Sequence, residues 1–314
     1  MMNRNRYLHI LSYLHFTDNR NEPDRTDENS ERLWKIRELS EMLNGTLSKF
    51  YNPSENLVID EVIVSFKGRV SFTQYIHKKC RYFGIKIFKL CDLTGYTYDM
   101  KVYVGKDRQR TAQHLTAIHA IVTKLTRKTE GRGHKLYMEN LFSSPELYDD
   151  LAKKQIYCCG TFRLKMRVMP KDIAPKIIKL KSGDIHVRTS ADLTAIFWQD
   201  KTDICMLTNI HNAPVEVIFC NEGGKATKLQ TVMDYNHHMV YVDKSDRMAK
   251  LLHQLVYIQV DKKKKKMFFH LLGLAILNSY ILQSLYRDKK ILHRNFQFAF
   301  VRNMLAHAGP EHRT

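Results

Sequence analysis

Four acidic residues could supply carboxylates to a divalent metal ion, although they are spread over most of the chain: Asp60, Glu139, Asp243 and Asp246. Asp60 lies within the apolar stretch LVIDEVIVSF, residues 57–66. Alternation places apolar residues on both faces of this predicted strand, which is typical of a central strand covered on both sides. A carboxylate there loses hydration, and a cation or hydrogen-bond donors must offset that cost. A metal ion is one such cation.

The other three acids lie at the ends of predicted elements. Glu139 ends a short strand in LYMENLF, and Asp243 and Asp246 are three residues apart, on one side of the first turn of a predicted helix. Taken singly, each acid has an ordinary explanation: a contact with an arginine or water, an exposed strand end, or an N-cap. Glu61 points away from Asp60 and is expected to form only a salt bridge.

The order of elements that would position these acids predicts a mixed sheet. Two further strands, FGIKIFKLCD and TYDMKVYVG, are joined by a hairpin turn at Gly95. A helix near 111–127, a strand at HKLYMENLF, a helix capped by Ser144 with Pro145 at its first position, and a strand at IYCCGTFR follow. The resulting order, β-β-β-α-β-α-β, is the connectivity of an RNase H-like sheet. In that sheet the acids of strand one, strand four and a later helix meet at one edge.

The predicted fold class is therefore α/β: an RNase H-like mixed sheet flanked by helices, with a β-rich insertion and helical N- and C-terminal segments. The expected boundaries are 1–52 for a partial helical dimerisation and DNA-binding region, 53–164 for the first part of the catalytic domain, 165–225 for the β-rich insertion, 226–300 for the rest of the catalytic domain with closing helices, and 301–314 for a C-terminal tail. Two closing helices are expected, one beginning near VDKSDRMAKLLHQL and an apolar one from residue 267. We interpret the second as a core helix rather than a membrane span.

Composition indicates the kind of partner. Lys+Arg 51 against Asp+Glu 32 gives a net charge of +19, which favours nucleic acid and, less often, an anionic membrane surface. Five consecutive lysines fit a nuclear localisation signal or a phosphate-contacting stripe, and equally a solvated loop between helices: Lys262, Lys263, Lys264, Lys265 and Lys266.

The cysteines form no C-x-x-C pair and are expected to be buried thiols in a reducing compartment.

Three other side chains are candidates for a functional role: Trp198 for a contact with DNA, and His237 and His238 for binding a metal ion. Trp198 could stack on a base, but a tryptophan in an alternating strand is more often part of the core. His237 and His238 lie close to the third acid. Hard metal ions bound by carboxylates seldom need imidazole, so these two histidines are expected in a loop near DNA.

Several linked segments resemble, in order and spacing, the DDE-type transposase domain of the piggyBac family, and above all its transposable-element-derived, domesticated or relic members: LVIDEVIVSFKGR, YIHKKCRYFGIKIFKLCDLTGYTYDMKVYVG, YMENLFSSPELYDDLAKKQIYCCGTFR and DYNHHMVYVDKSDRM. The resemblance implies an RNase H-like catalytic domain, DNA cleavage driven by Mg²⁺ or Mn²⁺ without zinc, and joining at TTAA. By position it places the catalytic acids on Asp60, Glu139 and Asp243, with Asp246 as a further metal contact.

Two departures from the family pattern predict an impaired site. Glu139-Asn140 stands where the family has Asp-Asn, and Val240-Tyr241 where it has Gly-Gly. The longer glutamate displaces its carboxylate, and a misplacement of about 1 Å can lower a rate roughly 100-fold. The resemblance also implies that the chain begins inside the family's N-terminal helical region and ends before a zinc module.

These observations predict a nuclear, transposase-derived protein that binds double-stranded DNA. Its cleavage and strand-transfer site is expected to be degraded, a homodimer is its expected assembly, and neither a membrane nor a small-molecule substrate is expected. The alternative is a non-catalytic, domesticated DNA- or chromatin-binding protein. A third hypothesis, an unrelated metal-dependent nuclease of the same fold, is disfavoured by the motif spacing.

Overall fold

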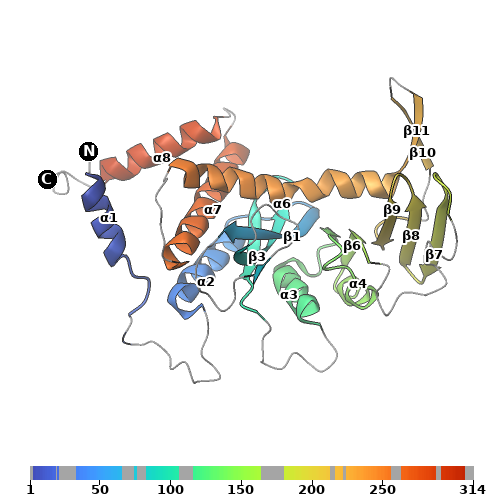
Figure 1. Cartoon of the computed structure of the whole chain (residues 1–314), viewed down its shortest axis with the longest axis horizontal. Coiled ribbons are helices and arrows are strands. Elements are labelled where there is room, and N and C mark those ends of the chain that lie inside the picture. Colours follow the sequence, from blue (N-terminus) through green and yellow to red (C-terminus); the bar gives the residue numbers. More distant parts are fainter. Residues whose placement is uncertain are drawn as a thin grey trace.

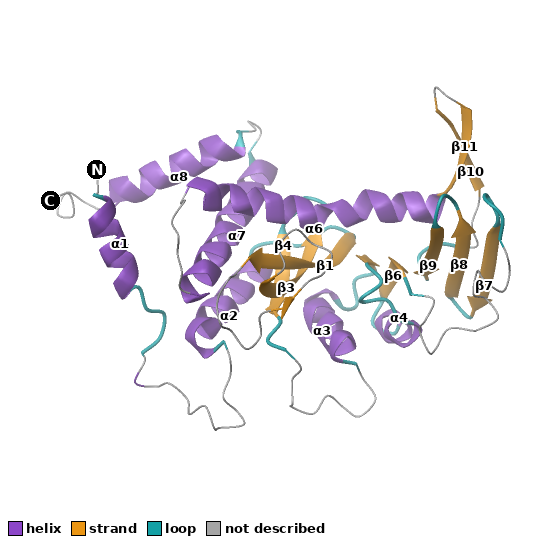
Figure 2. Ribbon diagram, viewed as in Figure 1, coloured by secondary structure: helices purple, strands orange, loops and turns teal. Residues whose placement is uncertain are grey.

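The computed structural model describes residues 3–18, 20, 33–65, 74–75, 83–105, 116–163, 180–212, 216–221, 224–255, 263–287 and 291–307. A mixed sheet runs through the middle of the molecule, and helices cover both of its faces (Figures 1 and 2). Its strands are β1 (Asn56–Ser65), β2 (Gln74–Tyr75), β3 (Phe83–Asp92), β4 (Thr97–Val102), β5 (His134–Met138), β6 (Ile156–Thr161), β7 (Ile185–Ser190), β8 (Leu193–Gln199) and β9 (Asp203–Thr208). A separate hairpin is formed by β10 (Glu216–Asn221) and β11 (Gly224–Leu229).

The strand order is β2-β3-β1-β5-β6-β9-β8-β7, with β4 paired to β3. β1 pairs antiparallel with β3 and parallel with β5, and β5 pairs parallel with β6. This is the RNase H-like connectivity, so the predicted fold class is confirmed. β9 pairs antiparallel with β6, so the strands between residues 185 and 208 extend the same sheet through backbone hydrogen bonds. The division into domains stays a prediction.

The helices are α1 (Arg4–Tyr13), α2 (Trp34–Lys49), α3 (Ala117–Thr126), the 3₁₀ turn η2 (Arg127–Thr129), α4 (Pro145–Ala152), α6 (Gln230–Leu255), α7 (Lys263–Tyr286) and α8 (His293–His307). The predicted caps of α4 are confirmed: Ser144 accepts a hydrogen bond from Leu147 N, and Pro145 is the first helical residue. The helix predicted from residue 111 begins at Ala117, and 111–115 lie outside the described residues. In the described part of the chain, three helices and not two follow the hairpin of β10 and β11.

Both faces of β1 are buried, as its alternation predicts. Leu57 and Ile59 lie in a core cluster with α3 and α4, whereas Val58 and Val62 lie in a cluster with α6 on the opposite face. A third cluster joins β3 and β4 to α2, α6 and α7. The free thiols that the structure places are buried in these clusters: Cys91, Cys158, Cys159 and Cys205. Trp198 is also a core residue, as expected.

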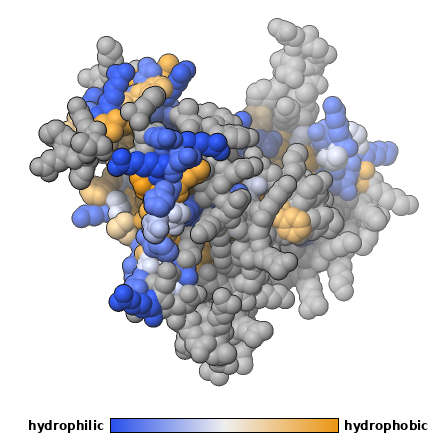
Figure 3. Space-filling model, turned by 60° about the vertical axis from the view of Figure 1, so that its left-hand side comes forward, coloured by the Kyte–Doolittle hydropathy of each residue, from blue (hydrophilic) through white to orange (hydrophobic). Residues whose placement is uncertain are grey.

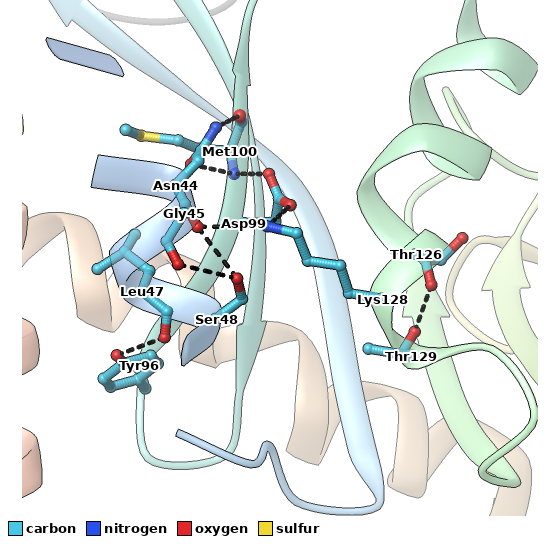
Figure 4. A network of polar contacts seen from close by, with 10 residues as sticks. All are labelled: Asn44, Gly45, Leu47, Ser48, Tyr96, Asp99, Met100, Thr126, Lys128 and Thr129. Carbon is cyan, nitrogen blue, oxygen red and sulfur yellow. Dashed lines mark hydrogen bonds and ion pairs between the residues drawn. The ribbon is translucent and has the colours of Figure 1, made fainter. Parts of the chain in front are cut away.

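Two asparagine side chains occupy the outer edge of β4. Asn44, from α2, donates to Met100 O at 2.8 Å and accepts from Met100 N at 3.2 Å (Figure 4). Asn278, from α7, forms the equivalent pair with Thr97, at 2.8 and 3.1 Å. Lys128 pairs with Asp99 at 3.1 Å and donates to Asn44 O at 3.2 Å. The helices thereby satisfy backbone groups that an open sheet edge would expose to other strands.

Replacing Asn44 with alanine should lower the free energy of unfolding by about 2 kcal/mol, because partly buried Met100 O loses its side-chain donor and Met100 N keeps only Asp99 Oδ1 as a side-chain acceptor. Urea unfolding followed by circular dichroism would measure the change. Ser48→Ala is the matched control, because the Ser48 hydroxyl bonds only carbonyls of its own helix, and its effect should stay within about 0.5 kcal/mol. Equal losses in the two variants would contradict the edge role of Asn44.

The apolar helix from residue 267 is part of α7. Among the residues described, the stretch Lys265–Tyr286 alone is long and apolar enough to cross a membrane by length and composition. Met267, Leu271, Leu274 and Leu277 are nevertheless buried in the cluster shared with α2. In this structure α7 therefore packs as a core helix.

The outer side of the helical end of the molecule carries apolar side chains among polar ones (Figure 3). Those exposed on α1 and α8 are Leu8, Ile10, Tyr13, Phe298, Val301, Met304 and Leu305. Phe298, Val301 and Leu305 are spaced three and four residues apart, so they share one side of α8.

Candidate carboxylate site

Asp60 lies on β1, and Glu139 directly follows the neighbouring parallel strand β5. Val58 is level with Tyr137 and Ile59 with Met138, so Asp60 and Glu139 occupy the next position along both strands. They also share a face with Val58 and Tyr137, because alternate residues point to the same side. Adjacent strands are about 5 Å apart. The structure therefore brings the first two predicted acids together.

The helix α6 covers this face. It runs from the β10–β11 hairpin across the sheet to α7 (Figure 1). Val232 and Val242 of α6 are buried in the same cluster as Val58 and Val62 of β1. Asp60, between those two valines, is only 6% exposed, whereas Glu139 at the strand end is exposed.

Tyr235 of α6 lies close to both acids. Its hydroxyl is 3.4 Å from Thr161 Oγ1 on β6. Burial raises the pKa of Tyr235, and the negative charges of Glu139 and Asp60 raise it further. A phenol therefore stays protonated beside the two carboxylates, in a position from which it can donate a hydrogen bond.

The third acidic position differs from the prediction. α6 begins at Gln230, so Asp243 and Asp246 lie in the middle of a 26-residue helix rather than in its first turn. Asp246 is on the side that faces the sheet and is 8% exposed, whereas Asp243 is exposed. Val240 and Tyr241, which stand where the family has two glycines, continue the helix. Asp243 and Asp246 are three residues apart and therefore neighbours on the helix surface, where the buried side of α6 meets its exposed side.

The side chain that sequence reasoning missed is Lys89. It is the direct cross-strand neighbour of Asp60 on β3 and is fully buried, at 0% exposed. Its ammonium donates to Ser245 Oγ on α6 at 2.9 Å. The signal was present in the sequence, because Lys89 interrupts a run of alternate apolar residues, Ile85, Ile87 and Cys91. Glu61, on the other face, pairs with Lys86 at 3.6 Å, as expected.

The carboxylates do not form a ligand set for a metal ion in the part of the chain that the structure describes. No group of three or more His, Cys, Asp or Glu side chains there is arranged to hold one. Asp60 is buried under α6 and Asp246 is buried on that helix, whereas Glu139 and Asp243 are exposed. Binding of Mg²⁺ or Mn²⁺ therefore stays a prediction, and we derive no catalytic step through a metal.

His237 and His238 lie in α6, so the prediction of a loop was wrong. His238 stacks on Tyr137 with ring centroids 4.1 Å apart, and its Nδ1 donates to Asp234 O at 2.6 Å. Burial lowers the pKa of His238. His211, which follows β9, lies 2.8 Å from the Asp234 carboxylate. These contacts hold the first turns of α6 against β5 and the end of β9.

Of the five consecutive lysines, Lys265 is the one whose side-chain contact the structure describes. Lys265 is buried, and its ammonium donates to Leu11 O of α1, so it is unsuited to a phosphate contact. Lys262 lies outside the described residues, and the structure does not describe the side chains of Lys263 and Lys264. Lys266 is half-buried.

Known proteins resemble the chain in sequence and in fold. The family model described as Transposase IS4 matches residues 1–280. Two human relatives are PiggyBac transposable element-derived protein 5, 22% identical over 99% of this chain, and PiggyBac transposable element-derived protein 2, 26% identical over 72% of it. The chain spans 62% and 39% of their respective lengths.

Among solved structures, the chain is similar to a piggyBac transposase in a cryo-EM synaptic complex with hairpin DNA. The TM-score is 0.79 at 22% identity, over 99% of this chain and 66% of that one. This similarity shows a shared fold, which in piggyBac transposase is RNase H-like. With the match to the family model over most of its length, the chain belongs to the Transposase IS4 family and is of the piggyBac type.

Proposed function

We propose that this chain is a transposase-derived protein that binds double-stranded DNA and whose DDE-type cleavage and strand-transfer site is degraded. Its family and its net charge of +19 support the DNA-binding part, because a cationic surface attracts the phosphate backbone whatever the sequence. The structural relative was solved with hairpin DNA, which makes duplex DNA the first ligand to test.

One observation carries the proposal of a degraded site: Asp60 and Asp246 are buried, whereas Glu139 and Asp243 are exposed. DDE-type transposases use divalent metals, and two-metal phosphoryl transfer needs carboxylates that share ions about 4 Å apart. Here Asp60, at 6% exposed, lies opposite the Lys89 ammonium, whereas Asp243 is exposed. This arrangement supports a protein that binds DNA but does not cleave it efficiently. We propose Mg²⁺ or Mn²⁺ as the ion of any residual activity.

The cellular compartment and the oligomeric state of the protein stay predictions. The nucleus is the compartment in which such a protein would meet double-stranded DNA. A homodimer would place two cationic surfaces on one duplex, and the exposed apolar side of α8, with Phe298, Val301 and Leu305, is the surface on which pairing would be sought.

Fluorescence anisotropy with labelled duplexes, one carrying TTAA and one without it, tests DNA binding. Affinity should fall roughly 100-fold or more as salt rises from about 50 to about 200 mM, because each phosphate contact releases counterions. Asp60→Asn should bind as tightly as the unmodified chain, because Asp60 is buried under α6. Salt-independent binding, or none, would contradict the DNA-binding part.

Cleavage is tested with the same duplexes in Mn²⁺. The unmodified chain and Asp60→Asn should both leave the DNA intact, so that their product levels are equal. Glu139→Asp restores the shorter side chain of the family at the exposed strand end, and any nicking should be confined to that variant. Mn²⁺-dependent nicking by the unmodified chain that disappears in Asp60→Asn would show that the site is intact.

A further inference from the structure

Lys89 is unusual among the buried side chains of this fold. It is one of the largest side chains with no exposed surface, and it carries an ammonium group on the sheet face that α6 covers. Burying a lone charge is costly enough that such a group is normally paired with an opposite charge. Lys89 is therefore expected to have a negatively charged neighbour on this face.

The backbone register identifies its nearest acid. Lys89 and Asp60 are directly opposite on antiparallel β3 and β1, and cross-strand neighbours of this kind have Cβ atoms about 5 Å apart on the same face. Asp246 follows Ser245, the residue that accepts the hydrogen bond from Lys89, and it is buried as well. Asp60, Lys89 and Asp246 are thus three buried charged residues in the region where α6 crosses β1 and β3.

The other acids of this region belong to other contacts. Asp99 pairs with Lys128 on the α3 side of the sheet, and Asp92 accepts from Tyr51 and Thr94. The Lys89 charge also reaches its neighbour Cys91: burial raises the pKa of that thiol, and Lys89 acts in the opposite direction. The ammonium is therefore directed to the face that carries Asp60.

We propose that Lys89 is an internal cation that supplies the positive charge needed to keep Asp60 buried, so that this face is neutralised and α6 is held in place without a divalent metal ion. Lys89 is a positioning residue: through Ser245 it fixes α6, and through its charge it stabilises Asp60. The inference does not depend on DNA binding, so the two proposals can fail separately.

A double-mutant cycle tests the charge coupling. Lys89→Met keeps most of the side-chain volume but leaves Asp60 without its neighbouring ammonium, and it should lower Tm by about 10 °C. In an Asp60→Asn background the same substitution should lower Tm by less than half as much, because the Asp60 charge that Lys89 compensates is then absent. Equal losses in both backgrounds would overturn the proposal and leave Lys89 a packing residue.

Lys86→Met is the matched control on the same strand. Lys86 lies on the opposite face, is partly exposed and pairs with Glu61 at 3.6 Å, so its loss should change Tm by less than about 2 °C. If Lys89→Met fails to fold, a folded Asp60→Asn/Lys89→Met protein supports the proposal, whereas failure of both overturns it.

The second measurement is the effect of divalent ions on the unmodified chain. Millimolar Mg²⁺, Mn²⁺ or EDTA should leave its Tm unchanged within about 1 °C, because Lys89 already neutralises the face and no metal binds preferentially to the folded state. A rise of several degrees with Mn²⁺ that is lost in Asp60→Asn would show that a metal binds beside Lys89, and would overturn the proposal.

Discussion

Replacing Gly160 with alanine is expected to lower the free energy of unfolding by about 3 kcal/mol or more. Gly160 lies in β6, where a Cβ atom would be 2.4 Å from Met138 O, 2.5 Å from Ser143 Oγ and 2.7 Å from Tyr148 Oη. A backbone carbonyl cannot move away as the end of a flexible side chain can. The alanine methyl group would therefore have to separate β6 from β5 or displace α4.

The expected damage reaches the carboxylate site. Met138 directly precedes Glu139, and the Ser143 hydroxyl accepts a hydrogen bond from Tyr148 at 3.1 Å. Moving either group would shift the end of β5 relative to β1, and with it the separation of Glu139 and Asp60. Gly160 thus sets how closely β5 and β6 pack beneath the two acids.

Urea unfolding, followed by circular dichroism, would measure this loss. Gly45→Ala is the control, because Gly45 lies inside α2 with nothing within 4 Å of the added methyl group. Alanine favours a helix interior over glycine, so this variant should gain up to about 1 kcal/mol. A Gly160→Ala protein as stable as the unmodified chain would show that β5, β6 and α4 are less closely packed than described.

Local patterns predicted the elements on which the site is built. Apolar residues on both faces of the strand around Asp60 identified a central strand, Gly95 identified the hairpin turn that its φ of +86° requires, and Ser144 with Pro145 identified the start of α4. Parallel pairing of β1 and β5 then brings Asp60 level with Glu139. These features depend on a few neighbouring residues and on one common sheet topology.

The first residue of α6 could not be predicted from such local sequence patterns. The segment from Gln230 to Tyr241 contains β-branched, aromatic and histidine residues with modest helix propensity, so it has no strong local helix signal. It becomes helical because Val232 and Val242 pack on the sheet and His238 stacks on Tyr137. Tertiary packing, and not propensity, therefore decides where Asp243 and Asp246 lie.

The contacts that define the site are also too distant in the chain to be found from spacing. Lys89 and Ser245 are 156 residues apart, and Cys158 of β6 is connected to Asn209 beyond β9. The resemblance to the family identified the acids but not the lysine beside them. Only the assembled sheet shows that Asp60 faces an ammonium group.

Replacing Asp92 with alanine is expected to lower the free energy of unfolding by about 4 kcal/mol, because it removes several hydrogen bonds to one buried carboxylate. Asp92 ends β3 and has no exposed surface. It accepts from Tyr51 Oη, from Thr94 Oγ1 at 2.6 Å and from Thr94 N at 2.9 Å. It thereby ties the segment before β1 to the β3–β4 turn.

This turn also supports α6. A methyl group added to Gly95 would lie 3.8 Å from Ser245 Cβ, so the turn packs against the residue that bonds Lys89. Loss of the Asp92 carboxylate would loosen the turn on which that part of α6 rests. The consequence for the site is a shift of Ser245 relative to β3.

Two substitutions separate the contributions to this loss. Asp92→Asn keeps the shape and one acceptor and should cost about half as much as Asp92→Ala, whereas Tyr51→Phe removes a single hydrogen bond and should cost about 1 kcal/mol. Burial raises the pKa of Tyr51, and its hydrogen bond to Asp92 raises it further, so the phenol remains a donor throughout the usual pH range. If Asp92→Ala were no more destabilising in urea than Tyr51→Phe, the turn would not depend on the carboxylate, and α6 would be anchored without it.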